Sequence, residues 1–95
     1  MAVQFTWDPK KAEANLRKHG VSFPEGISIF IDPLARIHDD PSHSAQEPRE
    51  IIVGHSDRGR LLLVSFTERN GQIRIISARR ATRHERQDYE KRDHF

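Results

Sequence analysis

The second half of the chain alternates apolar and polar residues, a pattern typical of β-strands that bury one face. Three segments show it: Glu50–His55, Arg60–Glu68 and Gln72–Arg79. Ser56–Gly59 is a turn between the first two, and Asn70-Gly71 is the strongest short signal for a two-residue type I′ hairpin. The pattern therefore predicts three consecutive antiparallel strands.

The N-terminal segment carries the signals of a short strand and a helix. Val3–Trp7 alternates as a strand. Asp8 is a favourable N-cap, Pro9 fits the first helical position, and Gly20 suits the left-handed conformation that ends many helices. The sequence thus predicts one strand followed directly by one helix.

Two more helices and one more strand complete the pattern. A capping-box spacing that begins at Ser22 predicts a second helix, which Pro33 ends. Leu34–His38 alternates as a strand. A second capping box at Thr82 predicts a last helix that reaches Arg92.

Together these elements predict a single α+β domain over residues 1–95. The expected order is β-α-α-β-β-β-β-α, an antiparallel sheet meander with N-terminal helices and a C-terminal helix. The polar segment Asp39–Pro48 has two prolines and no periodicity, so we expect a mobile loop there. A chain of 95 residues is too short for two adequate cores.

Charge is distributed unevenly along the chain. Residues 1–57 carry six Lys or Arg against nine Asp or Glu, whereas residues 58–95 carry ten against five. Twelve of the sixteen basic residues are arginines, whose planar guanidinium can bind phosphate through two parallel hydrogen bonds. The arginine-rich half favours a polyanionic partner, with nucleic acid as the first candidate. An ordinary solvated charged surface is the alternative.

Several classes of protein and site are not indicated. The chain has no cysteine, and its six histidines lack the spacing of metal ligands, so we predict neither a disulfide nor a metal site. His43, in the polar loop, is expected to be a surface residue. No apolar run approaches the roughly 20 residues of a membrane span, and the N-terminus lacks the layout of a signal peptide. A cytoplasmic protein is therefore expected.

The hairpin at Asn70-Gly71 predicts where two arginines lie. An unbroken two-residue hairpin places Leu62 opposite Arg79, so that Arg60 and Arg79 share one face of the sheet as diagonal neighbours. Two like charges at the edge of an apolar face repel each other unless an anion lies between them. This pair is the sharpest indication of an anion-binding site.

Further polar residues are expected around these arginines. His55 ends the preceding strand, Arg80 follows Arg79, and Arg83 and His84 lie in the first turn of the last helix. The N-terminus of a helix attracts phosphate through its free N–H groups and its dipole. The alternative is that the arginines only form ion pairs: Arg79, Arg80, Arg83 and Arg86 with Glu85, Asp88, Glu90 or a carboxylate early in the chain.

Several stretches of the sequence occur together in one known family. They are Phe5–Ala12, Asn15–Phe23, Asp32–Ala35, Gly59–Leu62 and Arg74–Thr82, followed by Glu85-Arg86 and Tyr89-Glu90. In this combination, over nearly the whole chain, the sequence resembles the BrnT family of toxins. The family positions that the resemblance carries over are Trp7, Lys18, His19, Arg60, Arg79 and Arg80.

The resemblance implies a function and a set of partners. It implies a RelE-like fold and a toxin of a type II toxin–antitoxin system that arrests growth by cleaving RNA. It also implies neutralisation by a BrnA-like antitoxin with a DNA-binding domain, so that operator DNA is bound only through the antitoxin.

A ribonuclease that needs no metal or other cofactor can use the 2′-hydroxyl of its substrate as the nucleophile. Such an enzyme needs a base, an acid, and cations around the phosphate. We expect Arg60 and Arg79 to stabilise the transition state. His19 and His55 are favoured over Glu68 and Tyr89 as base or acid. The residues expected to bind RNA are Arg80, Arg83, Lys18 and Trp7, although Trp7 is more readily explained as a core residue.

Two other functions fit the same residues. One is a nucleic-acid-binding module without catalysis, and the other is a domain that binds only a protein partner.

Overall fold

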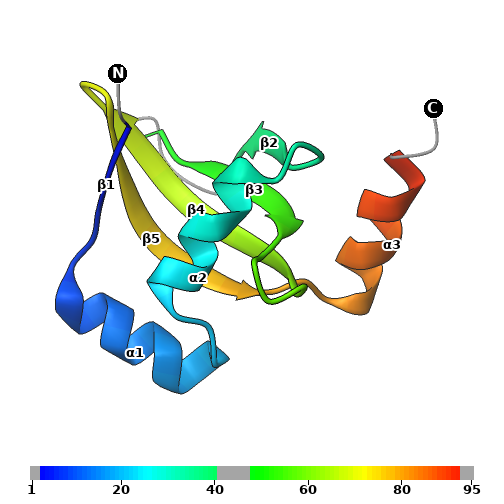
Figure 1. Ribbon diagram of the computed structural model, residues 1–95, viewed down its shortest axis with the longest axis horizontal. Coiled ribbons are helices and arrows are strands. Elements are labelled where there is room, and N and C mark those ends of the chain that lie inside the picture. The colour runs from blue at the N-terminus through cyan, green and yellow to red at the C-terminus, as the bar shows by residue number, and fades with distance from the viewer. Residues whose placement is uncertain (1–2, 41–47, 93–95) are drawn as a thin grey trace.

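The computed structural model describes residues 3–40 and 48–92. Their order confirms the α+β class and the predicted succession of elements. Figure 1 shows a twisted sheet with α1 and α2 on one side and α3 standing apart near the end of β5. The elements are β1 (Gln4–Thr6), α1 (Pro9–His19), α2 (Phe23–Ser28), the 3₁₀ helix η1 (Ile29–Ile31), β2 (Arg36–Asp39), β3 (Glu50–His55), β4 (Leu61–Arg69), β5 (Gln72–Arg80) and α3 (Arg83–Arg92).

The sheet has five strands in the order β1-β5-β4-β3-β2. Strands β2 to β5 pair with their sequence neighbours and run antiparallel, as the meander predicts. Strand β1 pairs parallel with β5, from Gln4 beside Gln72 to Thr6 beside Arg74. The first strand of the chain and its last strand therefore lie side by side in the sheet, with β1 at the edge. Most of the polar segment Asp39–Pro48, including His43, lies outside the described residues.

The hairpin between β4 and β5 turns at Asn70-Gly71, as predicted. Asn70 has φ 51° and Gly71 has φ 81°, the pair of positive values that a type I′ turn requires. Arg69 pairs with Gln72 directly beside the turn. Local sequence therefore fixes this end of the hairpin.

The predicted register does not hold along the whole hairpin. It is correct as far as Phe66 opposite Ile75, but the register then shifts, and Leu63 pairs with Arg79 and Leu62 with Arg80. The extra residue on β5 is Ile76, and a β-bulge of this kind moves every later side chain to the opposite face. The prediction that Arg60 and Arg79 share a face is therefore wrong.

The predicted caps begin and end the first two helices. Asp8 accepts the N–H of Lys10 at 2.9 Å, and Gly20 ends α1 with φ 68°. Ser22 accepts the N–H of Glu25 at 3.1 Å. The carboxylate of Glu25 takes no part in this cap, because it lies against Arg60.

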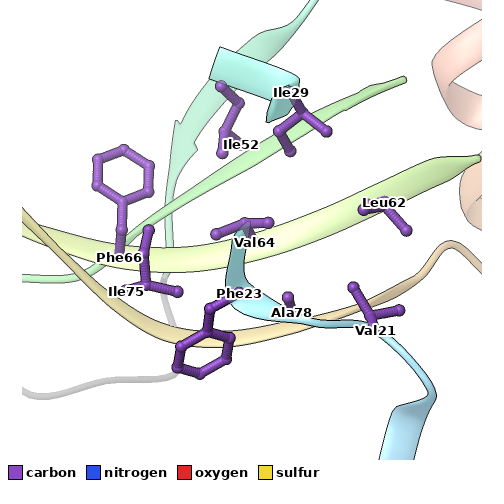
Figure 2. Close-up of a cluster of buried hydrophobic side chains, with 9 residues drawn as sticks. All are labelled: Val21, Phe23, Ile29, Ile52, Leu62, Val64, Phe66, Ile75 and Ala78. Carbon is purple, nitrogen blue, oxygen red and sulfur yellow. The ribbon is translucent and has the colours of Figure 1, made fainter. Parts of the chain in front are cut away.

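Apolar side chains form one cluster on each face of the sheet. The larger cluster packs β3, β4 and β5 against the segment that contains α2 and η1, and Figure 2 shows its members: Val21, Phe23, Ile29, Ile52, Leu62, Val64, Phe66, Ile75 and Ala78. The smaller cluster, on the α3 face, consists of Val53, Leu61, Leu63 and Tyr89. The bulge thus determines on which of these two faces each residue at the end of β5 lies.

A buried asparagine holds α1 against β5. The side-chain amide of Asn15 donates to the carbonyls of Val21 at 2.9 Å and Ala78 at 2.7 Å, and its oxygen accepts the N–H of Ala78 at 3.1 Å. A buried amide needs such partners, because an unpaired polar group in the core is costly. Asn15 therefore connects the first helix to the last strand.

Candidate functional site

The residues singled out in the sequence gather at one end of the sheet. His55 ends β3, Arg60 precedes β4, Arg79 and Arg80 end β5, and Arg83 begins α3. The N–H of Ala81 donates to the carbonyl of Leu61 at 2.9 Å, which ties the start of β4 to the segment before α3. The bulge divides these residues between the two faces of the sheet.

On the α1/α2 face, Arg60 is bound by Glu25. Arg60 Nε donates to Glu25 Oε2 at 2.9 Å, Arg60 Nη2 makes a second, short hydrogen bond to Glu25 Oε1, and the same Nη2 donates to the carbonyl of Gly20 at 3.1 Å. The hydroxyl of Ser56 also donates to Glu25, at 2.7 Å. The Glu25 side chain is only 4% exposed and that of Arg60 is 23% exposed. Arg60 thus compensates a buried charge.

This arrangement sets the ionisation of both groups. Hydrogen bonds from Arg60 lower the pKa of Glu25 despite the opposing effect of desolvation. The hydrogen bond to Glu25 raises the pKa of Arg60 in turn. Both groups therefore carry full charge at neutral pH. The predicted repulsion between Arg60 and Arg79 is absent, because Arg60 has a carboxylate partner of its own.

Other cations lie around Arg60 on this side. Arg58 approaches the same carboxylate, with 3.9 Å between Arg58 Nη1 and Glu25 Oε1. Lys18 and His19 end α1 directly before Gly20, and Lys18 is exposed. Arg80, opposite Leu62, takes the position diagonal to Arg60 that the sequence assigned to Arg79. These residues form a basic patch, which we call the α1-side patch.

On the opposite face, Arg79 is bound by the first turn of α3. Arg79 Nη1 and Nη2 donate to Glu85 Oε1 and Oε2, both at 2.8 Å. Glu85 also accepts the N–H of Thr82 at 2.8 Å, and Thr82 Oγ1 accepts the N–H of Glu85 at 3.1 Å, so the predicted capping box is present. The alternative interpretation of the sequence, in which Arg79 forms an ion pair with Glu85, is therefore correct for this arginine. Its side chain remains 39% exposed.

We expect the Arg79–Glu85 pair to make the domain less stable in acid. Hydrogen bonds from Arg79 lower the pKa of Glu85 from 4.5 to about 2. Because the pKa is lower in the folded state, the stabilisation is complete above the unfolded pKa and is lost as the pH falls from 4.5 towards 2. Both side chains are partly exposed, so the pair should contribute about 1–2 kcal/mol.

Urea unfolding of the wild type and of Glu85→Gln, at roughly pH 6 and pH 2.5, measures this contribution. The variant should be less stable at the higher pH and should lose less stability on acidification. An identical acid dependence in both proteins would contradict the assignment.

His55 lies on the same α3 face as Arg79, with strand β4 between their two strands. Its backbone N–H donates to Asp32 Oδ2 at 2.8 Å, and its ring Nδ1 lies 3.9 Å from the same oxygen. The ring of Tyr89 meets the imidazole edge to face, with 5.8 Å between centroids. The Tyr89 hydroxyl donates to the carbonyl of Leu34 at 3.0 Å. Asp32 thus fixes the backbone of His55, and its imidazole packs on Tyr89 with the side chain 45% exposed.

Gly54 allows this approach of Asp32 to β3. A Cβ atom at Gly54 would lie 3.0 Å from the Cβ of Ala35 and 3.2 Å from Asp32 Oδ2. Both distances are shorter than ordinary van der Waals contact, so a side chain at this position would push the Asp32 carboxylate away from His55. Asp32 and Gly54 were not singled out in the sequence, because the contact joins segments that are distant along the chain.

A cavity of about 120 Å³ lies between α3 and the sheet on this same face. Residues of β2, β3, β4 and α3 line it: Arg36, His38, Val53, Leu63, Glu85, Asp88 and Tyr89. Glu85 thus belongs both to the cavity wall and to the Arg79 pair, and Tyr89 contacts both the cavity and His55. We call the cavity together with Arg79 and His55 the α3-side site.

Two of the sequence candidates, Trp7 and Glu68, belong neither to the α1-side patch nor to the α3-side site. The ring of Trp7 packs edge to face on Phe23, with 6.2 Å between centroids, and adds to the larger apolar cluster. Glu68 is near the opposite end of β4, beside the hairpin turn. Among residues 3–40 and 48–92, no three His, Asp or Glu side chains are grouped as metal ligands. In the same ranges, no helix has the length and hydropathy to cross a membrane.

Comparisons with known proteins give a family match and a structural match. The family model described as "Ribonuclease toxin, BrnT, of type II toxin-antitoxin system" matches residues 7–85. A crystal structure of the Brucella abortus ribonuclease toxin BrnT superposes with a TM-score of 0.67 at 21% sequence identity, covering 86% of this chain and 100% of that one. At this identity the superposition shows the fold alone. Comparison with curated protein sequences gives no significant match.

Proposed function

Because the chain belongs to the BrnT family of ribonuclease toxins from type II toxin–antitoxin systems, we propose that it is an endoribonuclease whose reaction takes place at the α3-side site. The observation that carries this proposal is the position of Arg79 and His55 on one face, each still partly exposed, with the Arg79 guanidinium bound by Glu85 and the His55 backbone bound by Asp32. A bound cation and an imidazole are two of the groups that phosphodiester cleavage without a metal uses.

The reaction would use the 2′-hydroxyl of the RNA as the nucleophile. The 2′-oxygen attacks the neighbouring phosphorus, the bond from phosphorus to the 5′-oxygen breaks, and the products are a 2′,3′-cyclic phosphate and a free 5′-hydroxyl. Arg79 would stabilise the charge that builds on the non-bridging oxygens. His55 would take the proton from the 2′-hydroxyl or give one to the leaving 5′-oxygen, and solvent water would carry out the other of these two proton transfers.

The α1-side patch suits RNA binding better than catalysis. Lys18, His19 and Arg80 lie on this side, and the guanidinium of Arg60 is already bound by Glu25 and Gly20. Arg83, exposed in the first turn of α3, would extend the binding surface on the other face. Phosphates on both sides of the scissile bond could then be bound at the same end of the sheet. Trp7 keeps a structural role in this proposal, since it packs on Phe23.

The family also supports a protein partner. We propose that a BrnA-like antitoxin neutralises the protein by covering the α3-side site, and that operator DNA is bound only through this antitoxin. Carboxylates on the antitoxin would complement the arginines at the end of the sheet, and such association weakens as salt rises.

Purified protein incubated with RNA in the presence of EDTA tests the proposal. We expect cleavage that survives the chelator, products that end in a 2′,3′-cyclic phosphate, and loss of cleavage when the antitoxin is added. Retention of RNA that depends on salt, without cleavage, would instead identify a nucleic-acid-binding module. If RNA is neither cleaved nor retained, the chain would instead be a domain that binds only a protein partner.

A further inference from the structure

We propose that the cavity between α3 and the sheet binds one nucleobase of a single-stranded RNA. The proposal rests on the ribonuclease function proposed above and names a specificity subsite for it. The cavity lies on the same face as Arg79 and His55. Its size, its lining and its neighbours each point to a base.

The size of the cavity matches one aromatic ring. An engineered protein cavity of about 150 Å³ binds benzene. The cavity under α3 measures about 120 Å³, which suits a single six-membered ring.

The lining offers apolar surface to the ring and polar groups to its edge. Val53 and Leu63, from neighbouring strands, form an apolar floor, and Tyr89 adds an aromatic wall. Small-molecule sites commonly combine apolar walls with a few polar groups. Such walls favour the flat, apolar faces of a base.

The polar groups around the cavity complement a base edge. Arg36 and His38 project from β2 as donors, and Asp88 from α3 supplies an acceptor. Each of the four bases presents a donor beside an acceptor on its Watson–Crick edge. A guanidinium has five N–H groups and a carboxylate about four lone-pair sites, so these residues can serve a base in addition to partners within the protein.

The position of the cavity also suits a base whose own phosphate reacts at Arg79 and His55. Glu85 lines the cavity and binds Arg79, while Tyr89 lines the cavity and contacts His55. A nucleotide with its base in the cavity can therefore place its own phosphate between Arg79 and His55. A base within a duplex cannot enter such a cavity, so the substrate is single-stranded or locally unpaired.

Binding of small nucleotides tests the subsite without requiring cleavage. The probes are the four nucleoside 3′-monophosphates, with ribose 5-phosphate and inorganic phosphate as ligands that lack a base, titrated into the purified protein and followed by amide chemical shifts. At least one nucleotide should bind about tenfold more tightly than either ligand without a base. Shifts should concentrate at Val53, Leu63 and Tyr89.

Two exposed residues of the lining allow substitutions that should not disturb folding. His38→Ala and Asp88→Asn should each remove most of the tenfold advantage of the base while leaving phosphate binding unchanged. Glu90→Gln is the matched control, because Glu90 is exposed on α3 but does not line the cavity. It should bind nucleotides as the wild type does.

The results separate this inference from the proposed function. If the bases add no affinity, or if both lining variants keep the full base-dependent affinity, the subsite is disproved even when RNA is cleaved. If nucleotides bind as expected but RNA is not cleaved, the ribonuclease proposal fails and the cavity remains a nucleobase site.

Discussion

Replacing Arg79 with alanine is expected to lower the rate of RNA cleavage by about a hundred- to a thousandfold, the usual effect of removing one preorganised donor from a developing negative charge. The domain should stay folded, because Glu85 keeps its hydrogen bonds to Thr82 and is partly open to water. Arg79→Lys should restore only part of the activity, since an ammonium group cannot make the two parallel hydrogen bonds of a guanidinium.

The control for this substitution is Arg74→Ala. Arg74 is exposed on the same strand as Arg79, and it lies near the hairpin turn, far from the site. Cleavage rates and thermal melts should be measured for all three variants. A folded Arg79→Ala protein with wild-type activity would move the reaction to the α1-side patch, where Lys18, His19 and Arg80 would be tested next.

Replacing Arg60 with alanine is expected to act on stability. Glu25 is 4% exposed, and without Arg60 its charge stays in the protein with only Ser56 and the distant Arg58 beside it. Removing one partner of a buried pair is strongly destabilising, because the other charge loses its compensation. The melting temperature should fall by many degrees, and any loss of toxicity should follow from unfolding.

A second variant separates this effect from catalysis. Because a buried ion pair can often be replaced by apolar groups of similar volume, Glu25→Leu combined with Arg60→Met should recover most of the lost stability. Arg58→Ala is the matched control. Arg58 is exposed and comes no closer than 3.9 Å to the same carboxylate, so its loss should change the melting temperature little. An Arg60→Ala protein that melts like the wild type but is inactive would instead make Arg60 a catalytic residue.

The features that the sequence predicts correctly depend on residues close together along the chain. Asn70-Gly71 forms its turn with four consecutive residues, and the caps at Asp8, Ser22 and Thr82 reach only two or three positions ahead. The hydrogen bonds of such turns and caps form between residues close together in the sequence, so their geometry can be predicted from the residue types. This is why the order of helices and strands is correct.

The features that the sequence does not reveal join distant segments. Nothing in the alternation around Ile76 marks a bulge, because Ile75 and Ile76 are both apolar and either could face the core. Glu25 already has a sufficient explanation in its capping box, which conceals its contact with Arg60 across 35 positions. The end of the sheet where the site lies was predictable, whereas the face on which each arginine lies was not.

The clamp between Asn15 and Ala78 has a consequence for how the protein is made. Synthesis proceeds from the N-terminus at about 5–20 residues per second, so α1 leaves the ribosome well before the strand to which it must bind. Strand β1 likewise cannot pair until β5 has been made, because β5 is its neighbour in the sheet. Contacts that span 63 positions cannot form until nearly the whole chain has emerged. Incomplete chains therefore lack the strand that both α1 and β1 contact, so the sheet and its first helix can assemble only after β5 has been made.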